Sequence, residues 1–123
     1  MSTLVAVPSD MPGGLDAPMG MHFGHCDLFT LVETEDNKVT TVTTMPNPPH
    51  EEGGCLAPVQ LLAGKGVNAI IVGGMGYRPL MAFAQAGIRV LYAKAPTVQA
   101  CIDAYLAGQL PEFSKDQTCH GGA

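Results

Sequence analysis

The chain has 123 residues, of which 46% are hydrophobic and 14% are charged, and its formal net charge is −5 at pH 7. This size and composition suit one folded domain and exclude a disordered chain. The acidic balance and the lack of any basic run argue against nucleic acid as a partner.

The first half of the chain predicts three strands. A short apolar run that ends at a proline, residues 3–8, is typical of a buried strand. Residues 9–26 hold many glycines and prolines and show no helical period, so we expect a long loop there. Two stretches rich in β-branched residues, 28–34 and 39–45, flank an Asp-Asn turn and predict a β-hairpin.

The second half predicts helices that alternate with strands. Because helices join parallel strands through right-handed crossovers, these strands should extend one sheet. The fold class we expect is α/β: one domain over residues 1–110 with a five-stranded mixed sheet, an antiparallel second strand and flanking helices. A flexible tail over residues 111–123 follows. The expected helices cover 56–63, 78–87 and 97–108, and the expected strands cover 68–74 and 88–93.

The expected chain direction brings distant loops to one edge of the sheet. The first strand ends at Pro8, and the antiparallel second strand begins after Cys26 at the same edge. The third strand returns there, so the loop that holds His50 and Cys55 starts at this edge. A fourth strand parallel to the first ends there too, at residues 73–76. Carboxyl ends of strands in open α/β sheets are where ligands bind.

The residues gathered at this edge are soft metal ligands. Two thiolates with nearby imidazoles suit an iron–sulfur cluster, Cu(I), zinc or a mixed metal–sulfide cluster. The glycines let backbone approach a bulky ligand, and the helix after residue 76 points free N–H groups towards an anion. The predicted metal ligands are Cys26, Cys55, His22, His25 and, from the tail, Cys119 and His120. The residues predicted to contact the rest of the cofactor include Gly54, Gly74, Met75 and Gly76.

Each of these side chains also has a purely structural interpretation. Cys26 suits a strand entrance, Cys55 suits packing at a helix start, and the histidines suit solvated loops. Cys101 lies at helical spacing with apolar neighbours, so we expect it in the core. The short apolar runs and the absence of signal-peptide features predict a cytoplasmic protein with reduced thiols. The sequence still leaves a redox disulfide open.

Catalytic motifs are missing from the sequence. The "GGMG" stretch lacks the third glycine of a dinucleotide fingerprint and the Gly-Lys-Ser/Thr of a phosphate loop. No Ser-His-Asp set follows from the spacing. The first strand, "TLVAVP", carries no carboxylate, which argues against nuclease chemistry. We therefore expect a protein that is not an enzyme.

Three segments resemble a known family. They are "HFGHCDLF", "HEEGGCLAPVQLLAGKGVNAIIVGGMGYRPLMAFAQAGIRVLY" and "TVQACIDAYLAGQL", and together they span roughly residues 3–110. In order and spacing the chain is similar to the dinitrogenase iron–molybdenum cofactor-binding family. Members include nitrogenase-cofactor carrier and assembly proteins and the orange proteins, which hold a molybdenum–copper sulfide cluster.

The resemblance implies a ribonuclease-H-like fold and binding or transfer of a metal–sulfide cluster, of iron–sulfur, iron–molybdenum or molybdenum–copper type, rather than catalysis. It implies a carrier in metallocofactor assembly, such as nitrogenase cofactor biosynthesis. It sets the cluster edge at the "HFG" segment and adds Gly24 to the cofactor contacts. The cysteines at 26 and 55 suggest that this member holds metal by thiolate.

The expected partners are cofactor-assembly or acceptor proteins, with no nucleic acid and no membrane, and a homodimer is an option. The alternative function is a regulatory or interaction module that binds a small anion or a protein partner through the same edge.

Overall fold

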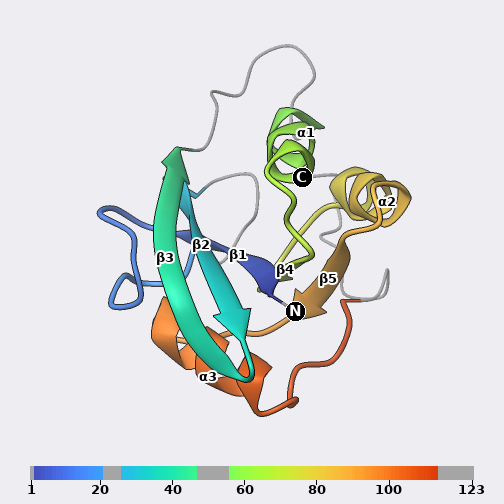
Figure 1. The fold of residues 1–123 in the computed structure, drawn as a ribbon. Coiled ribbons are helices and arrows are strands. Elements are labelled where there is room, and N and C mark those ends of the chain that lie inside the picture. Colours follow the sequence, from blue (N-terminus) through green and yellow to red (C-terminus); the bar gives the residue numbers. More distant parts are fainter. Residues whose placement is uncertain (1, 21–25, 47–55, 114–123) are drawn as a thin grey trace.

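The computed structural model describes residues 2–20, 26–46 and 56–113. Its elements follow the predicted order of three strands and then alternating helices and strands (Figure 1). In chain order they are β1 (Thr3–Ser9), β2 (Leu28–Glu35), β3 (Lys38–Pro46), α1 (Leu56–Gly64), β4 (Ala69–Val72), α2 (Tyr77–Gln85), β5 (Arg89–Tyr92) and α3 (Val98–Leu106).

The strands form one five-stranded mixed sheet in the order β3-β2-β1-β4-β5. Strand β2 runs antiparallel to both β1 and β3, and β4 pairs parallel to β1 and to β5. The predicted α/β class, the strand number and the antiparallel second strand are therefore confirmed. The ribonuclease-H-like description stays a prediction.

Helices cover both faces of the sheet, with α1 and α2 on one face and α3 on the other (Figure 1). Alternation along β1 builds the two cores: Ala6 packs with the residues under α1 and α2, whereas Val5 and Val7 pack with those under α3. All three side chains are fully buried. Because both faces of β1 are covered, apolar side chains are favoured on both of its faces, which explains the continuous apolar run in the sequence.

Local signals fix the turns. Asp36 and Asn37 adopt left-handed φ values of 53° and 61°, as a two-residue hairpin turn between twisted strands requires. Thr97 caps α3, its side chain accepting a hydrogen bond from the Ala100 N–H at 3.2 Å. Gly108, one residue beyond the C-cap of α3, has a φ of 71°, which glycine adopts without strain.

The predicted loop over residues 9–26 begins on the α3 side of the molecule and ends at Cys26, which lies in the core under α1 and α2. Val98 at the start of α3 donates its N–H to Ala17 O at 3.0 Å. Ala17 and Met19 are buried in the core beneath α3. This loop is therefore part of the α3 layer up to Met19.

The chain beyond α3 covers the outer side of β5. The Tyr92 N–H donates to Pro111 O at 2.9 Å, and the Phe113 N–H donates to Val90 O at 2.8 Å. The predicted tail thus begins with three residues that pair with the sheet, and residues 114–123 lie outside the described part. No helix among the described residues is long and apolar enough to cross a membrane.

Candidate cluster-binding edge

Four strand ends meet at one edge of the sheet. Ser9 at the end of β1 pairs with Leu28 at the start of β2, and Leu28 pairs in turn with Pro46 at the end of β3. Strand β4, parallel to β1, ends beside them at Val72. The predicted convergence of strand ends is therefore confirmed, because antiparallel β2 reverses the chain between β1 and β3.

The structure describes part of the predicted site. Cys26, Gly74, Met75 and Gly76 are described, and all four are buried. Ligation by these residues stays a prediction. The other predicted site residues lie outside the described residues and stay predictions as well: His22, Gly24, His25, Gly54, Cys55, Cys119 and His120, together with His50 of the second loop.

Cys26 lies where the long loop returns to the sheet. Its side chain is 7% exposed and belongs to the core under α1 and α2, as do Phe29 and Met75. Gly20 donates its N–H to Pro8 O at 2.8 Å. A Cβ atom built on Gly20 would lie 3.0 Å from Cys26 Cβ. Gly20 and Cys26, which are six positions apart in the sequence, therefore lie next to each other beside the end of β1.

The thiol of Cys26 is protonated at neutral pH. Its pKa is raised from 9.0 to about 12, and burial is the largest cause. The Ser9 backbone hydrogen bond lowers the pKa in part, and the charges of Asp27 and Asp10 contribute to the rise. A metal ion must therefore displace a proton from this sulfur, which couples metal affinity to pH. Without metal, Cys26 acts as a packed apolar side chain.

Alkaline pH is expected to destabilise the metal-free protein through its buried thiols. An unfolded thiol keeps the ordinary pKa of 9.0, whereas the folded values are about 12 for Cys26 and about 11 for Cys101. Above pH 9 the unfolded chain loses these protons first, so the free energy of unfolding falls by up to about 1.4 kcal/mol per pH unit for each thiol. Urea unfolding at a series of pH values measures this.

The Cys26→Ser variant supplies the control for the pH series, because it removes one of the two buried thiols and keeps the rest of the chain. Its free energy of unfolding should fall less steeply with pH than that of the wild type. Equal slopes for the two proteins would contradict a buried, protonated Cys26.

The start of α2 presents backbone N–H groups at the same edge. The N-cap is Gly76, which has no side chain to cap the helix, and the first intrahelical bond runs from the Leu80 N–H to Gly76 O at 3.3 Å. The N–H groups of Tyr77 and Arg78 lie ahead of that bond. Such groups favour an anion. Met75 is 2% exposed, so its thioether fills the core.

Several residues near Cys26 were not singled out by the sequence. They are Ser9, Asp10, Gly20 and Asp27, and only Asp27 adjoins Cys26 in the chain. The Asp27 carboxylate accepts the Met11 N–H at 3.1 Å, which ties the two ends of the long loop together. No signal in the sequence identifies contacts between the loop ends, because they depend on the path of the loop.

The described residues supply only some of the predicted metal ligands. No group of three or more His, Cys, Asp or Glu side chains that could hold a metal ion occurs within residues 2–20, 26–46 and 56–113. Cys101 is fully buried in the core under α3, where its Sγ lies 3.1 Å from Met19 Sδ, so its predicted core position is confirmed. Cys26 is therefore the one described cysteine at the edge where the strands end.

Comparisons with known proteins agree with this fold. An uncharacterized protein of Methanocaldococcus jannaschii is 38% identical over 96 residues, which are 75% of this chain and 80% of that protein. The apo form of the orange protein from Desulfovibrio gigas superposes with a TM-score of 0.81 at 25% identity, covering 91% of this chain and 93% of that one. A Thermotoga protein solved by NMR superposes with a TM-score of 0.75 at 29% identity, covering 89% and 92%.

The family model described as "Dinitrogenase iron-molybdenum cofactor" matches residues 1–108, which include every helix and strand of the structure. The predicted resemblance is thereby confirmed, and the chain belongs to the dinitrogenase iron–molybdenum cofactor family.

Proposed function

We propose that this protein binds an anionic metal–sulfide cluster at the edge where β1 and β4 end, and carries it to an acceptor protein without catalysing a reaction. The cargo is of iron–sulfur, iron–molybdenum or molybdenum–copper type, and the carrier works in the cytoplasm during metallocofactor assembly. The observation that carries the proposal is the position of Cys26, a thiol that lies against Gly20 and interacts with the Ser9 backbone at the end of β1, in a member of this family.

In this proposal Cys26 supplies a thiolate ligand after it loses its proton. The Ser9 backbone N–H, whose hydrogen bond lowers the pKa of Cys26, stabilises the sulfur in its charged form. His25 precedes Cys26 directly in the chain, and His22 lies in the same five residues between Gly20 and Cys26. The other metal ligands of this proposal are Cys55, Cys119 and His120, which lie outside the described residues. The proposed contacts with the rest of the cofactor are Gly24, Gly54, Gly74, Met75 and Gly76.

The charges near the site act in opposite directions on an anionic cargo. Asp10 and Asp27 repel it, but both are exposed, and exposed charges are weakened by water and salt. Backbone N–H groups attract it: that of Ser9, which is buried, and those of Tyr77 and Arg78 at the start of α2, which are exposed. The Ser9 N–H acts in a lower dielectric than the exposed carboxylates, which favours the attraction.

Reconstitution without oxygen tests this function. Metal-free protein is incubated with iron and sulfide, and in a second sample with molybdate, copper and sulfide, and is then freed of unbound metal by gel filtration. We expect a coloured protein with stoichiometric metal in at least one sample. A colourless protein that holds no iron, molybdenum or copper in either sample would contradict the proposal.

A further inference from the structure

Strand β3 forms an open edge of the sheet. It is nine residues long and pairs with β2 over most of its length. Within the described part of the chain no strand pairs with its outer side. Its middle residues, 40–44, are all exposed, and Val42 is 36% exposed. This strand therefore presents a row of backbone N–H and C=O groups to a second strand.

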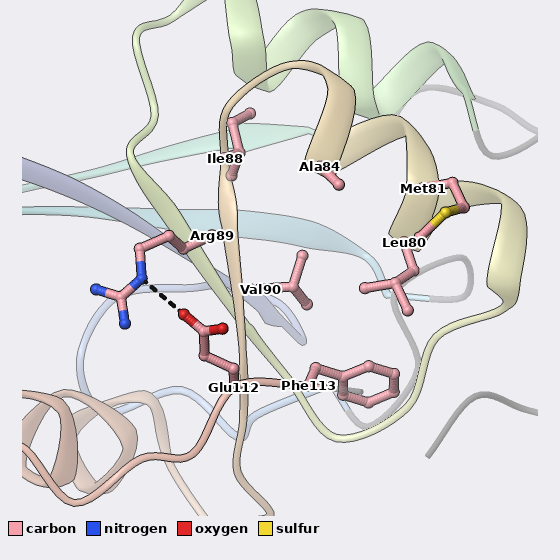
Figure 2. Close-up of a pocket in the computed structure, with 8 residues that line it drawn as sticks. All are labelled: Leu80, Met81, Ala84, Ile88, Arg89, Val90, Glu112 and Phe113. Atoms are coloured by element: carbon pink, nitrogen blue, oxygen red, sulfur yellow. Dashed lines mark hydrogen bonds and ion pairs between the residues drawn. The ribbon is translucent and has the colours of Figure 1, made fainter. Parts of the chain in front are cut away.

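The opposite edge of the sheet, strand β5, is covered by another segment of the chain. Residues 111–113 pair antiparallel along β5 through two backbone hydrogen bonds. Figure 2 shows the result: Phe113 lies beside Val90, and Arg89 forms an ion pair with Glu112. The chain thus covers β5 with its own backbone and leaves β3 without a cover among the described residues.

The middle of β3 carries none of the side chains that usually prevent strands from pairing. Residues 40–44 read Thr-Thr-Val-Thr-Thr, with no charge and no proline. The bulge opposite Glu33 and Thr34 lies near the Lys38 end, where the Thr40 hydroxyl donates to Glu33 O at 3.1 Å. The stretch from Thr41 to Met45 is regularly paired with β2, and no strand of the described part of the chain pairs with its other side.

We propose that a second copy of this chain pairs with β3 in antiparallel orientation, about a two-fold axis at Val42, so that the two sheets join into one. In this arrangement, a residue that lies a given number of positions before Val42 faces the partner's residue the same number of positions after Val42. Thr41 then faces the partner's Thr43, and Val42 faces the partner's Val42.

The strand is self-complementary in this register. Cross-strand pairs of threonine and of β-branched residues are favourable. Lys38, the single charged residue of β3, lies beyond the bulge at the end of the strand, so no two like charges of the strands stand opposite each other. Within the regular stretch, a register centred on Val42 also matches outward-facing backbone groups with outward-facing groups, since Thr41 and Thr43 pair with positions of the same parity and the bulge at Thr40 lies outside these pairs.

The dimer leaves each cluster edge accessible. Because the strands are antiparallel, the Pro46 end of one copy lies beside the Lys38 end of the other. The two candidate sites therefore lie at opposite ends of the joined sheet, and dimer formation does not depend on the proposed function. An interface made by one strand is small, so the dimer should be weak and concentration-dependent.

Sedimentation velocity over about 0.01 to 1 mM protein tests the pairing, a range chosen for weak association. We expect the wild type to shift from monomer towards dimer across it. Val42→Lys places two charges opposite each other and should raise the dissociation constant by about tenfold. Leu61→Lys is the matched control, because Leu61 is an exposed apolar residue on α1, and it should dimerise like the wild type.

Crosslinking tests the register. Paired Cα atoms in antiparallel strands lie about 4.5–5.5 Å apart, within the span of a disulfide. Val42→Cys should therefore form a reducible dimer on mild oxidation, and Leu61→Cys and the wild type should form much less. The proposal fails if the wild type stays monomeric up to the highest concentration, if Val42→Lys dimerises as well as Leu61→Lys, or if Val42→Cys crosslinks no better than Leu61→Cys.

Discussion

Replacing Cys26 and Cys55 together by serine is expected to abolish cluster binding and to leave the fold intact. A serine hydroxyl is a poor ligand for the soft metals of sulfide clusters. Because changes in the surroundings of ligands already cost about 10–100-fold in metal affinity, loss of two thiolates should lower it by more than about 100-fold. Metal content and the visible spectrum after anaerobic reconstitution measure the loss.

The matched control for this experiment is Cys101→Ser. Cys101 is buried in the core under α3, on the other face of the sheet from the core that contains Cys26. This variant should be less stable than the wild type because it buries a hydroxyl in an apolar core. It should nevertheless bind the cluster. If the double variant keeps its colour while Cys101→Ser loses it, the site lies elsewhere in the molecule.

The Gly20→Ala variant is expected to displace Cys26, because Gly20 lies against Cys26 in the folded protein. The added Cβ would lie 3.0 Å from Cys26 Cβ and 3.4 Å from both Pro8 C and Ser9 N, so the loop must move against buried backbone. Overpacking of this kind typically costs about 1–3 kcal/mol in the free energy of unfolding. Urea unfolding of the metal-free protein measures the cost, and metal titration measures the accompanying loss of affinity.

Gly64→Ala supplies the comparison. Gly64 is the last residue of α1, and a Cβ built there meets no atom within 4 Å. Alanine at this position should raise the free energy of unfolding by about 0.4–1 kcal/mol, because it restricts the unfolded chain, and should leave metal affinity unchanged. If Gly20→Ala were as stable as the wild type and bound metal as tightly, the close approach of Gly20 to Cys26 would have no role in the site.

Much of the fold could be predicted because local chemistry and tertiary structure agree. The hairpin follows from the Asp36-Asn37 turn, and the α3 boundaries follow from Thr97 and Gly108. The prediction of a strand over residues 68–74 was too long, because β4 ends at Val72. Gly73 and Gly74, which were included in the predicted strand, belong to the connection between β4 and α2. Strand ends of this kind depend on neighbouring strands and are weakly encoded in the sequence.

The candidate site was only partly predictable. The edge itself followed from chain direction, and Cys26 lies there because it stands two residues before the antiparallel strand β2. The contacts of Gly20 and the charge effect of Asp10 depend on how a long loop closes on itself, which local patterns do not specify. The pairing of residues 111–113 with β5 was missed for a related reason, since backbone pairing alone leaves little trace in side-chain pattern.

The most direct test of the central claim, that Cys26 and the loops beside it hold a metal–sulfide cluster, is elemental analysis of the protein isolated from cells without exposure to oxygen. We expect iron, molybdenum or copper together with acid-labile sulfide in the wild type, in fixed ratio to protein, and their loss from the Cys26→Ser and Cys55→Ser double variant. Protein that contains neither metal nor sulfide, or a double variant that retains both, would contradict the claim.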